Sequence, residues 1–215
     1  MLQTNSRSAF GLAALLGIAS AVLTPGAQAA PAPARGTLLT SNFLTSYSRD
    51  AIGAMLASES QAEQPKCNVR VAEFTYATVG VEGEPATASG VLLIPDGERC
   101  AGPYPLLGWG RPTGTVRTEE QAKDIRDAKG NDPLVTRLAS QGYVVVSSDY
   151  LGLGKSSYGY HPYLHSATEA SATIDAMRCD ARGAQRVAVL EHTAVRQGDA
   201  VGVFAGRPHG DGHPA

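Results

Sequence analysis

The sequence lacks an excess of charge of either sign. Its 215 residues include 18 Lys and Arg residues against 20 Asp and Glu residues, which gives a formal net charge of -2. This charge balance gives no electrostatic reason to bind nucleic acid or an anionic membrane. The balance of 43% hydrophobic and 18% charged residues indicates a globular protein, and the length suits one domain.

The sequence also lacks an apolar run long enough to make a stable membrane span. Its most apolar segment, residues 10–23, is short and is broken at once by Pro25 and Gly26. The same run has the features of a secretory signal peptide, because Arg7 supplies a positive charge before it and small residues follow it. A buried core helix is the alternative interpretation.

The small residues after this run fix the expected domain boundaries at the N-terminus. Ala27, Gln28 and Ala29 form an A-x-A motif, which is typical of a signal-peptide cleavage site. We therefore expect a signal peptide at residues 1–29 and a flexible leader at residues 30–40. The mature protein would be secreted or periplasmic.

Cysteine is scarce, with three residues in the whole chain. Cys67 and Cys100 lie before and after a predicted β-hairpin, so a disulfide between them is plausible in an oxidising compartment. Two unpaired buried thiols are the alternative. Cys179 is left over, and an odd cysteine is unusual in an exported protein.

Two segments resemble binding motifs but lack residues that those motifs need. Gly154, Lys155 and Ser156 match the end of a phosphate-binding loop, but Asp149 stands where its first glycine should be and would repel phosphate. His209 and His213 in the glycine-rich tail have no further ligands at metal-binding spacing. We therefore expect no nucleotide, no other cofactor and no metal ion.

The pattern of apolar residues predicts the first half of an α/β sheet. An antiparallel hairpin is followed by a strand, a helix, a fully buried strand and a second helix, and a further parallel strand should come next. In the helix at 131–143, Asp132 is the expected N-cap and Gly142 the expected end. The expected elements are a helix at 41–59, strands at 70–83, 87–95, 103–110 and 143–148, and helices at 131–143 and 165–178.

Five segments of the chain together resemble one protein family. In order and in residue type they are similar to segments of secreted α/β-hydrolases of the secretory lipase type, over about residues 40–178. The D-Y-x-G-x-G run that begins at Asp149, followed by H-P-Y-L, is the most specific part. The segments are TASGVLLIP, PYPLLGWGRPTGT, LASQGYVVVSSDYLGLGKS, HPYL and ATIDAMR.

This resemblance implies an α/β-hydrolase fold, with residues 41–178 as a partial domain, and an ester or lipid as the substrate. In that family a Ser, an Asp and a His act in this chain order. The resemblance places Asp149 beside the oxyanion site, where its carboxyl group must be protonated to donate a hydrogen bond. Alternatively, Asp149 accepts backbone hydrogen bonds and shapes the turn. Arg111 departs from the family, because relatives often have histidine there.

A nucleophile elbow, G-x-S-x-G, is absent from the chain. Ser156 and Ser157 come nearest, but their spacing is wrong by one residue. When residues 201–215 are written as degenerate codons and read one nucleotide later, the triplets permit Gly-Tyr-Ser-Gln-Gly. We therefore predict a frameshift near Arg178, with an out-of-frame tail at 179–215. A genuine divergent C-terminus is the alternative.

The predicted function is that of a secreted carboxylic-ester hydrolase, a lipase or an esterase, which is inactive as written because its nucleophile is missing. A peptidase or another acyl hydrolase on the same fold, or a non-catalytic secreted protein, remains the alternative. The missing strand should leave residues 143–148 with an unpaired edge, and the tail should be poorly ordered.

Overall fold

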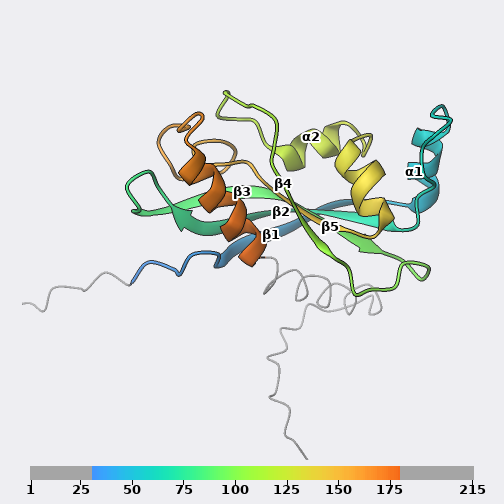
Figure 1. Ribbon diagram of the computed structural model, residues 1–215, viewed down its shortest axis with the longest axis horizontal. Coiled ribbons are helices and arrows are strands. Elements are labelled where there is room, and N and C mark those ends of the chain that lie inside the picture. Colours follow the sequence, from blue (N-terminus) through green and yellow to red (C-terminus); the bar gives the residue numbers. More distant parts are fainter. Residues whose placement is uncertain (1–30, 180–215) are drawn as a thin grey trace, which may run out of the picture. The chain divides into compact units, whose positions relative to one another are not determined.

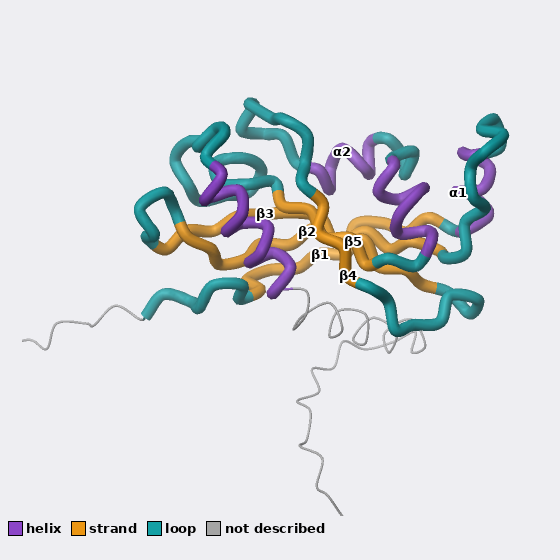
Figure 2. The backbone as a smooth tube through the Cα atoms, viewed as in Figure 1, coloured by secondary structure: helices purple, strands orange, loops and turns teal. Residues whose placement is uncertain are grey.

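A mixed sheet of five strands with helices on both faces is the centre of the fold (Figures 1 and 2). The computed structural model describes residues 31–179, so the expected signal peptide and all of the expected tail except Cys179 lie outside the described residues. The strand order is β1-β2-β3-β5-β4. The strands are β1 (Leu38–Tyr47), β2 (Asn68–Val79), β3 (Pro85–Asp96), β4 (Leu106–Trp109) and β5 (Val144–Ser148).

Helical segments connect these strands. α1 (Arg49–Leu56) follows β1, and α2 (Gln121–Asp127) follows the loop after β4. A π-helical turn at Leu134–Leu138 and a 3-10 turn at Ala139–Gln141 lead into β5. A last helix occupies residues 166–179.

The predicted hairpin is confirmed. β2 and β3 pair antiparallel along their whole length, from Asn68 opposite Asp96 to Val79 opposite Pro85. Gly90 is needed in this hairpin because a Cβ atom there would lie 2.3 Å from the carbonyl oxygen of Ser147 on β5. The glycine therefore allows β5 to pair closely beside β3.

The helix expected at 41–59 is wrong for its first half. Residues Leu38–Tyr47 form β1, which pairs antiparallel with β2, and only Arg49–Leu56 are helical. Ser48 separates the two elements, because its side chain accepts a hydrogen bond of 3.1 Å from the backbone N–H of Ala51 and so caps α1. The apolar residues of this stretch fitted a helical spacing, but pairing with the long neighbouring strand decides the conformation.

The helix expected at 131–143 is present, but it is not a regular α-helix. Asp132 accepts a hydrogen bond of 2.8 Å from the backbone N–H of Leu134, which is the capping role that the sequence predicts. Gly142 ends the segment with a left-handed φ of 103°. Between them the backbone forms a π-helical turn and then a 3-10 turn.

The prediction of an unpaired edge at β5 is wrong. β5 lies between β3, to which it is antiparallel, and β4, to which it is parallel. Its central residues are buried, as expected for a strand that is covered on both faces. Among the described residues the outer strand on this side is β4, which is only 4 residues long.

Two apolar clusters cover the two faces of the sheet. One joins α1, α2 and the turns at 134–141 to the strands, with Ile52, Ile125 and Val135 at its centre. The other joins the helix at 166–179 to the opposite face, where Tyr76 and Ala176 are fully buried. Because helices cover both faces, the ends of the strands are the places where polar side chains can meet.

The segment before β1 is tied to the last helix. Asp175, which is fully buried, accepts hydrogen bonds from Arg35 at 2.9 Å and from Thr78 at 2.9 Å. Arg178 donates to the other oxygen of the same carboxylate at 3.0 Å. The chain is therefore anchored from Arg35 onwards, although a flexible leader was expected over residues 30–40.

Cys67 and Cys100 form a disulfide, with their Cα atoms 5.1 Å apart. The bond joins the residue before β2 to the loop after β3 and so closes the open end of the hairpin. Cys179 is buried against the second apolar cluster and is not disulfide-bonded.

Candidate active site

The carboxyl ends of the two parallel strands lie side by side and present two long loops. Trp109, the last residue of β4, is paired with Ser147 near the end of β5. One loop runs from Gly110 to α2, and the other follows Asp149 to the last helix. In open α/β sheets, ligands bind outside the carboxyl ends of the parallel strands, so this edge is the candidate site.

Asp149 is the centre of this edge and is 1% exposed. Its Oδ2 accepts a hydrogen bond of 2.6 Å from the hydroxyl of Ser89 on β3, and its Oδ1 accepts one of 2.9 Å from the backbone N–H of Gln121. The carboxyl group thus links β3, β5 and the first residue of α2. Both of its oxygens already have a hydrogen-bonding partner.

Arg111 approaches Asp149 from the loop after β4. Its Nη1 lies 4.0 Å from Oδ1 of Asp149, and its Nη2 donates to Glu119 at 3.0 Å. The side chain is 6% exposed, and Nη1 has no hydrogen-bond acceptor among the described residues. A buried guanidinium group with one unsatisfied nitrogen is unusual in a folded protein and calls for an explanation.

Burial raises the pKa of Asp149 above the ordinary value of an aspartate. The hydrogen bonds from Ser89 and Gln121 and the positive charge of Arg111 act in the opposite direction, because they favour the carboxylate. Burial is the largest of these causes, so the pKa is raised despite the nearby arginine.

The loop that follows Asp149 has an unusual backbone. Tyr150 has a left-handed φ of 69°, and its N–H donates to the hydroxyl of Ser148 at 2.9 Å. Gly154, also left-handed, lies so close to Asp149 that a Cβ atom there would be 2.7 Å from Oδ2. Strain of this kind is often found at functional sites.

Arg117 holds this loop against the loop after β4. Its guanidinium group donates to three backbone carbonyl groups of the 149–165 loop, at distances from 2.8 to 3.4 Å. The two loops are therefore fixed to each other. The carbonyl groups are those of Gly152, Ser156 and Tyr158.

Ser156 and Ser157 serve the structure of this loop. The hydroxyl of Ser156 donates to the carbonyl oxygen of Thr87 at 2.7 Å, and that of Ser157 accepts from the N–H of Thr87 at 3.1 Å. Lys155 forms an ion pair of 2.6 Å with Glu73. Ser156, Ser157 and Lys155, which resembled parts of catalytic or phosphate-binding motifs in the sequence, thus attach the loop to the sheet.

A cavity of about 320 Å³ lies between the loop after β4 and α2. Its wall combines apolar side chains with a few polar groups, which is the usual composition of a small-molecule site. Ile125 and Leu134 belong to the wall, as do Trp109 and the buried Arg111. The remaining lining residues are Pro112, Thr113, Gln121, Asp124, Asp132 and Pro133.

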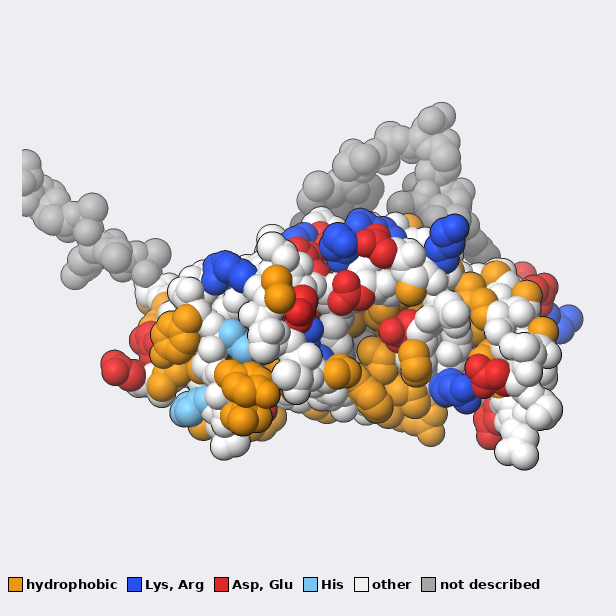
Figure 3. Space-filling view, turned by 90° about the horizontal axis from the view of Figure 1, so that it is seen from above, with side chains coloured by type: hydrophobic (Ala, Val, Ile, Leu, Met, Phe, Trp, Pro, Cys, Tyr) orange, Lys and Arg blue, Asp and Glu red, His pale blue; other side chains and the backbone are white. Residues whose placement is uncertain are grey.

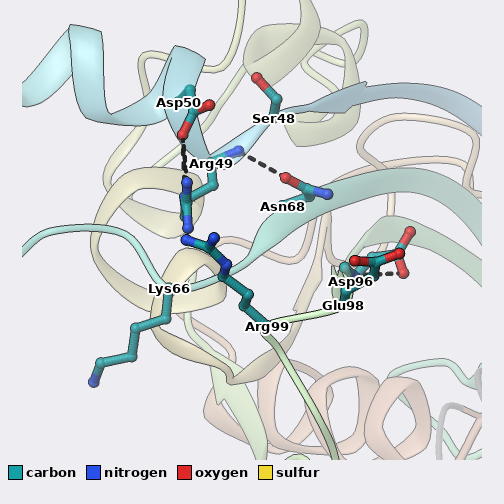
Figure 4. A pocket seen from close by; sticks show the side chains of 9 residues that line it. Ser48, Arg49, Asp50, Lys66, Asn68, Asp96, Glu98 and Arg99 are labelled. Atoms are coloured by element: carbon teal, nitrogen blue, oxygen red, sulfur yellow. Dashed lines mark hydrogen bonds and ion pairs between the residues drawn. The ribbon is translucent and has the colours of Figure 1, made fainter.

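A second cavity, of about 220 Å³, lies near the N-terminus of α1 (Figure 4). Three basic and three acidic side chains line it, so their charges balance, and Arg49 is already paired with Asp50 at 2.9 Å. In Figure 4 the side chain of Lys66 extends away from the others. The lining residues are Ser48, Arg49, Asp50, Lys66, Asn68, Asp96, Gly97, Glu98 and Arg99.

The sequence predicts Asp149 as a candidate site residue, but it does not predict which residues surround it. Ser89, Arg111 and Gln121 all lie far from Asp149 in the sequence, since Gln121 precedes it by 28 residues and Ser89 by 60. Arg111 was noticed only as a departure from the family pattern. The helix α2, which supplies the Gln121 N–H, was not predicted at all, so no sequence signal pointed to this contact.

Comparisons with known proteins agree with this architecture. A putative hydrolase from Legionella pneumophila has a similar structure, with a TM-score of 0.59 at 24% identity, over 72% of this chain and 40% of that one. No protein-family model and no curated protein matches the sequence. The fold of the described residues is that of the N-terminal portion of an α/β-hydrolase.

A crystal structure of a rice cell wall degrading esterase, LipA from Xanthomonas oryzae, is much more similar. The two chains are 78% identical, with a TM-score of 0.67, over 75% of this chain. The match spans 40% of the length of that esterase. The chain is therefore similar to the N-terminal portion of an α/β-hydrolase of the lipase and esterase type, and it spans less than half the length of that esterase.

Within residues 31–179, no helix is long and apolar enough to cross a bilayer. On the face that Figure 3 shows, basic and acidic side chains are interspersed.

Proposed function

We propose that this chain is part of an exported carboxylic-ester hydrolase, whose intact form uses a serine nucleophile activated by histidine. The observation that carries the proposal is the 78% identity to an esterase over 75% of the chain. An ester hydrolase is favoured over a peptidase for the same reason. The signal-like N-terminus and the disulfide between Cys67 and Cys100 support export.

We propose that Asp149 is a positioning residue of this site. Its two oxygens accept hydrogen bonds from Ser89 and Gln121, which supports a role in holding the loops over direct donation to an oxyanion. Direct donation would need a proton on an oxygen that faces the substrate. Oδ1 and Oδ2 are instead directed towards α2 and β3.

The 215-residue chain is proposed to be inactive because the nucleophile is encoded in another reading frame. The codons of residues 201–215 permit a G-x-S-x-G motif when they are read one nucleotide later, and the missing serine codon would straddle those of Phe204 and Ala205. In this proposal residues 41–178 are a partial hydrolase domain and residues 179–215 are out of frame. The nucleotide sequence of the region would test the frameshift directly.

An activity assay tests the proposed function. The 215-residue chain and a chain restored by one nucleotide near the codon of Arg178, and extended to its natural stop, are assayed on short and long p-nitrophenyl esters. We expect hydrolysis by the restored chain and only a residual rate, lower by about 10⁶, for the present one, because a triad without its nucleophile loses most of its catalysis. Equal rates in the two chains would contradict the frameshift, and inactivity of both would contradict the esterase.

A further inference from the structure

The unsatisfied nitrogen of Arg111 lies at the wall of the 320 Å³ cavity beside the ends of β4 and β5. The other nitrogen atoms of its guanidinium group are engaged, since Nε donates to Pro112 and Nη2 to Glu119. These two contacts hold the group in place. A fixed, buried N–H donor at the wall of a cavity is arranged to meet an acceptor that enters it.

The acidic side chains around Arg111 favour an uncharged hydrogen-bond acceptor in the ligand. Glu119 and Asp149 lie within 4.0 Å of its two Nη atoms, and Asp124 and Asp132 also line the cavity. A carboxylate ligand would be repelled by these acidic groups. A carbonyl oxygen accepts the same hydrogen bond without that repulsion.

The rest of the cavity suits an apolar body. Trp109, Ile125 and Leu134 belong to its wall, together with two prolines. A volume of about 320 Å³ is at the lower end of the range for small-molecule sites, so the ligand must be small. The cavity therefore fits a compact apolar group that carries one neutral oxygen acceptor.

We propose that this cavity binds the acyl group of a small uncharged carboxylic ester, with Nη1 of Arg111 donating a hydrogen bond to its carbonyl oxygen. The inference rests on the proposed function for the choice of an ester, and it names the part of the ester that the described residues hold. It does not need the serine nucleophile, so it applies to the 215-residue chain as it is.

The chain contains a natural reporter for this cavity. Its single tryptophan is Trp109, which lies in the cavity wall. Fluorescence excited at a wavelength that only tryptophan absorbs therefore reports on this cavity. Three probes separate the contributions: ethyl benzoate carries the ester carbonyl, benzoate carries a charge, and ethylbenzene carries neither. We expect a saturable change with ethyl benzoate, weaker binding of ethylbenzene and still weaker binding of benzoate.

Two substitutions test the role of Arg111. Arg111→Met removes the donor, and Arg111→Lys keeps the charge beside Glu119 but lacks the planar fork of the guanidinium group. In both variants the dissociation constant for ethyl benzoate should rise about tenfold, while that for ethylbenzene should not change. The matched control is Arg137→Met, at an exposed arginine that pairs with Glu59 outside the cavity, and it should bind as the wild type does.

The inference is overturned if both Arg111 variants bind ethyl benzoate as tightly as the wild type, if benzoate binds better than the ester, or if no probe gives a saturable change. Unchanged ethylbenzene binding shows that a variant is folded, and if the methionine variant fails this check the lysine variant decides. The result is separable from the proposed function. If the restored chain hydrolyses esters equally well with and without Arg111, the proposed function is supported and the inference is wrong. If the restored chain is inactive but binds ethyl benzoate in an Arg111-dependent way, the inference is supported and the proposed function is wrong.

Discussion

At the scale of single residues, the site depends on how closely the loop after β5 approaches Asp149. Gly154 permits this approach in two ways, because its φ of 56° is left-handed and it has no side chain. A Cβ atom at this position would lie 2.5 Å from the hydroxyl oxygen of Ser89 and 2.7 Å from Oδ2 of Asp149. The conformational cost and the steric cost can be measured separately.

We expect Gly154→Ala to lower the free energy of unfolding by about 3 kcal/mol or more, since it adds a clash to a left-handed backbone. Gly83→Ala is the matched control, because Gly83 has a φ of 84° but no heavy atom within 4 Å of the added Cβ. That variant should lose only about 1–2 kcal/mol. Urea denaturation of both variants checks the prediction, and equal losses would show that the loop can move away from Asp149.

Asp149 should also give the stability a characteristic pH dependence. Its pKa is raised in the folded state, mainly by burial, so its contribution is fully present below the ordinary aspartate pKa of about 4 and is lost as the pH rises through the raised value. Asp149→Asn removes this loss. The free energy of unfolding of the variant, relative to the wild type, should therefore increase as the pH rises above about 4.

The control for this measurement is Asp127→Asn. The hydrogen bond from Lys123 holds the pKa of the exposed Asp127 below its usual range, so its contribution is lost only as the pH falls. Relative to the wild type, this variant should show no change between about pH 4 and pH 7. The prediction for Asp149 is wrong if its variant gives the same flat difference over this interval.

The surroundings of Asp149 also show a limit of sequence reasoning at this scale. The D-Y-x-G-x-G run makes Asp149 a candidate site residue from the sequence, because a short motif is a local signal. The contacts with Ser89 and Arg111 depend on strands and loops that come together only in the folded chain. No local sequence pattern could predict these contacts, because the residues that make them are far from Asp149 in the sequence.

At the scale of the elements, the long hairpin of β2 and β3 is the most regular part of the fold. Alternating apolar residues and a turn between two strands predict it correctly, because both signals are local. β1 was misread as a helix, since its apolar residues satisfy either spacing and its pairing with β2 is a tertiary contact. α2 was not predicted, because it is short and its buried stripe is limited to Gln121, Ala122 and Ile125.

The disulfide closes this hairpin at its open end. Cys67 and Cys100 are separated by 33 residues, so the bond restricts a loop of moderate length in the unfolded chain. Replacing both by serine should lower the free energy of unfolding by about 3–4 kcal/mol. Denaturation of the double variant under oxidising conditions checks this value, with Cys179→Ala as a second variant that leaves the disulfide intact. A loss well below about 1 kcal/mol would show that the hairpin is equally restricted without the bond.

At the scale of the whole molecule, export and maturation are the features that can be tested first. We expect the mature protein to begin near Ala30, because an apolar run followed by Ala27-Gln28-Ala29 is typical of signal-peptidase substrates. N-terminal sequencing of the protein recovered outside the cytoplasm checks the prediction. A mature form that still begins at Met1 would contradict it. If the peptidase recognises the A-x-A motif, Ala29→Leu should abolish cleavage.

The ion pair between Arg35 and Asp175 leads us to expect that this maturation has an order in time. The expected cleavage site lies only five residues before Arg35, a reach of about 17 Å when the chain is extended. Once Arg35 is bound to Asp175, little free polypeptide remains for a protease to bind. Asp175 follows Arg35 by 140 residues, so in an exported chain it would be synthesised and translocated well after the expected cleavage site. We therefore expect cleavage to occur on the nascent chain, before the helix at 166–179 is available to hold Arg35.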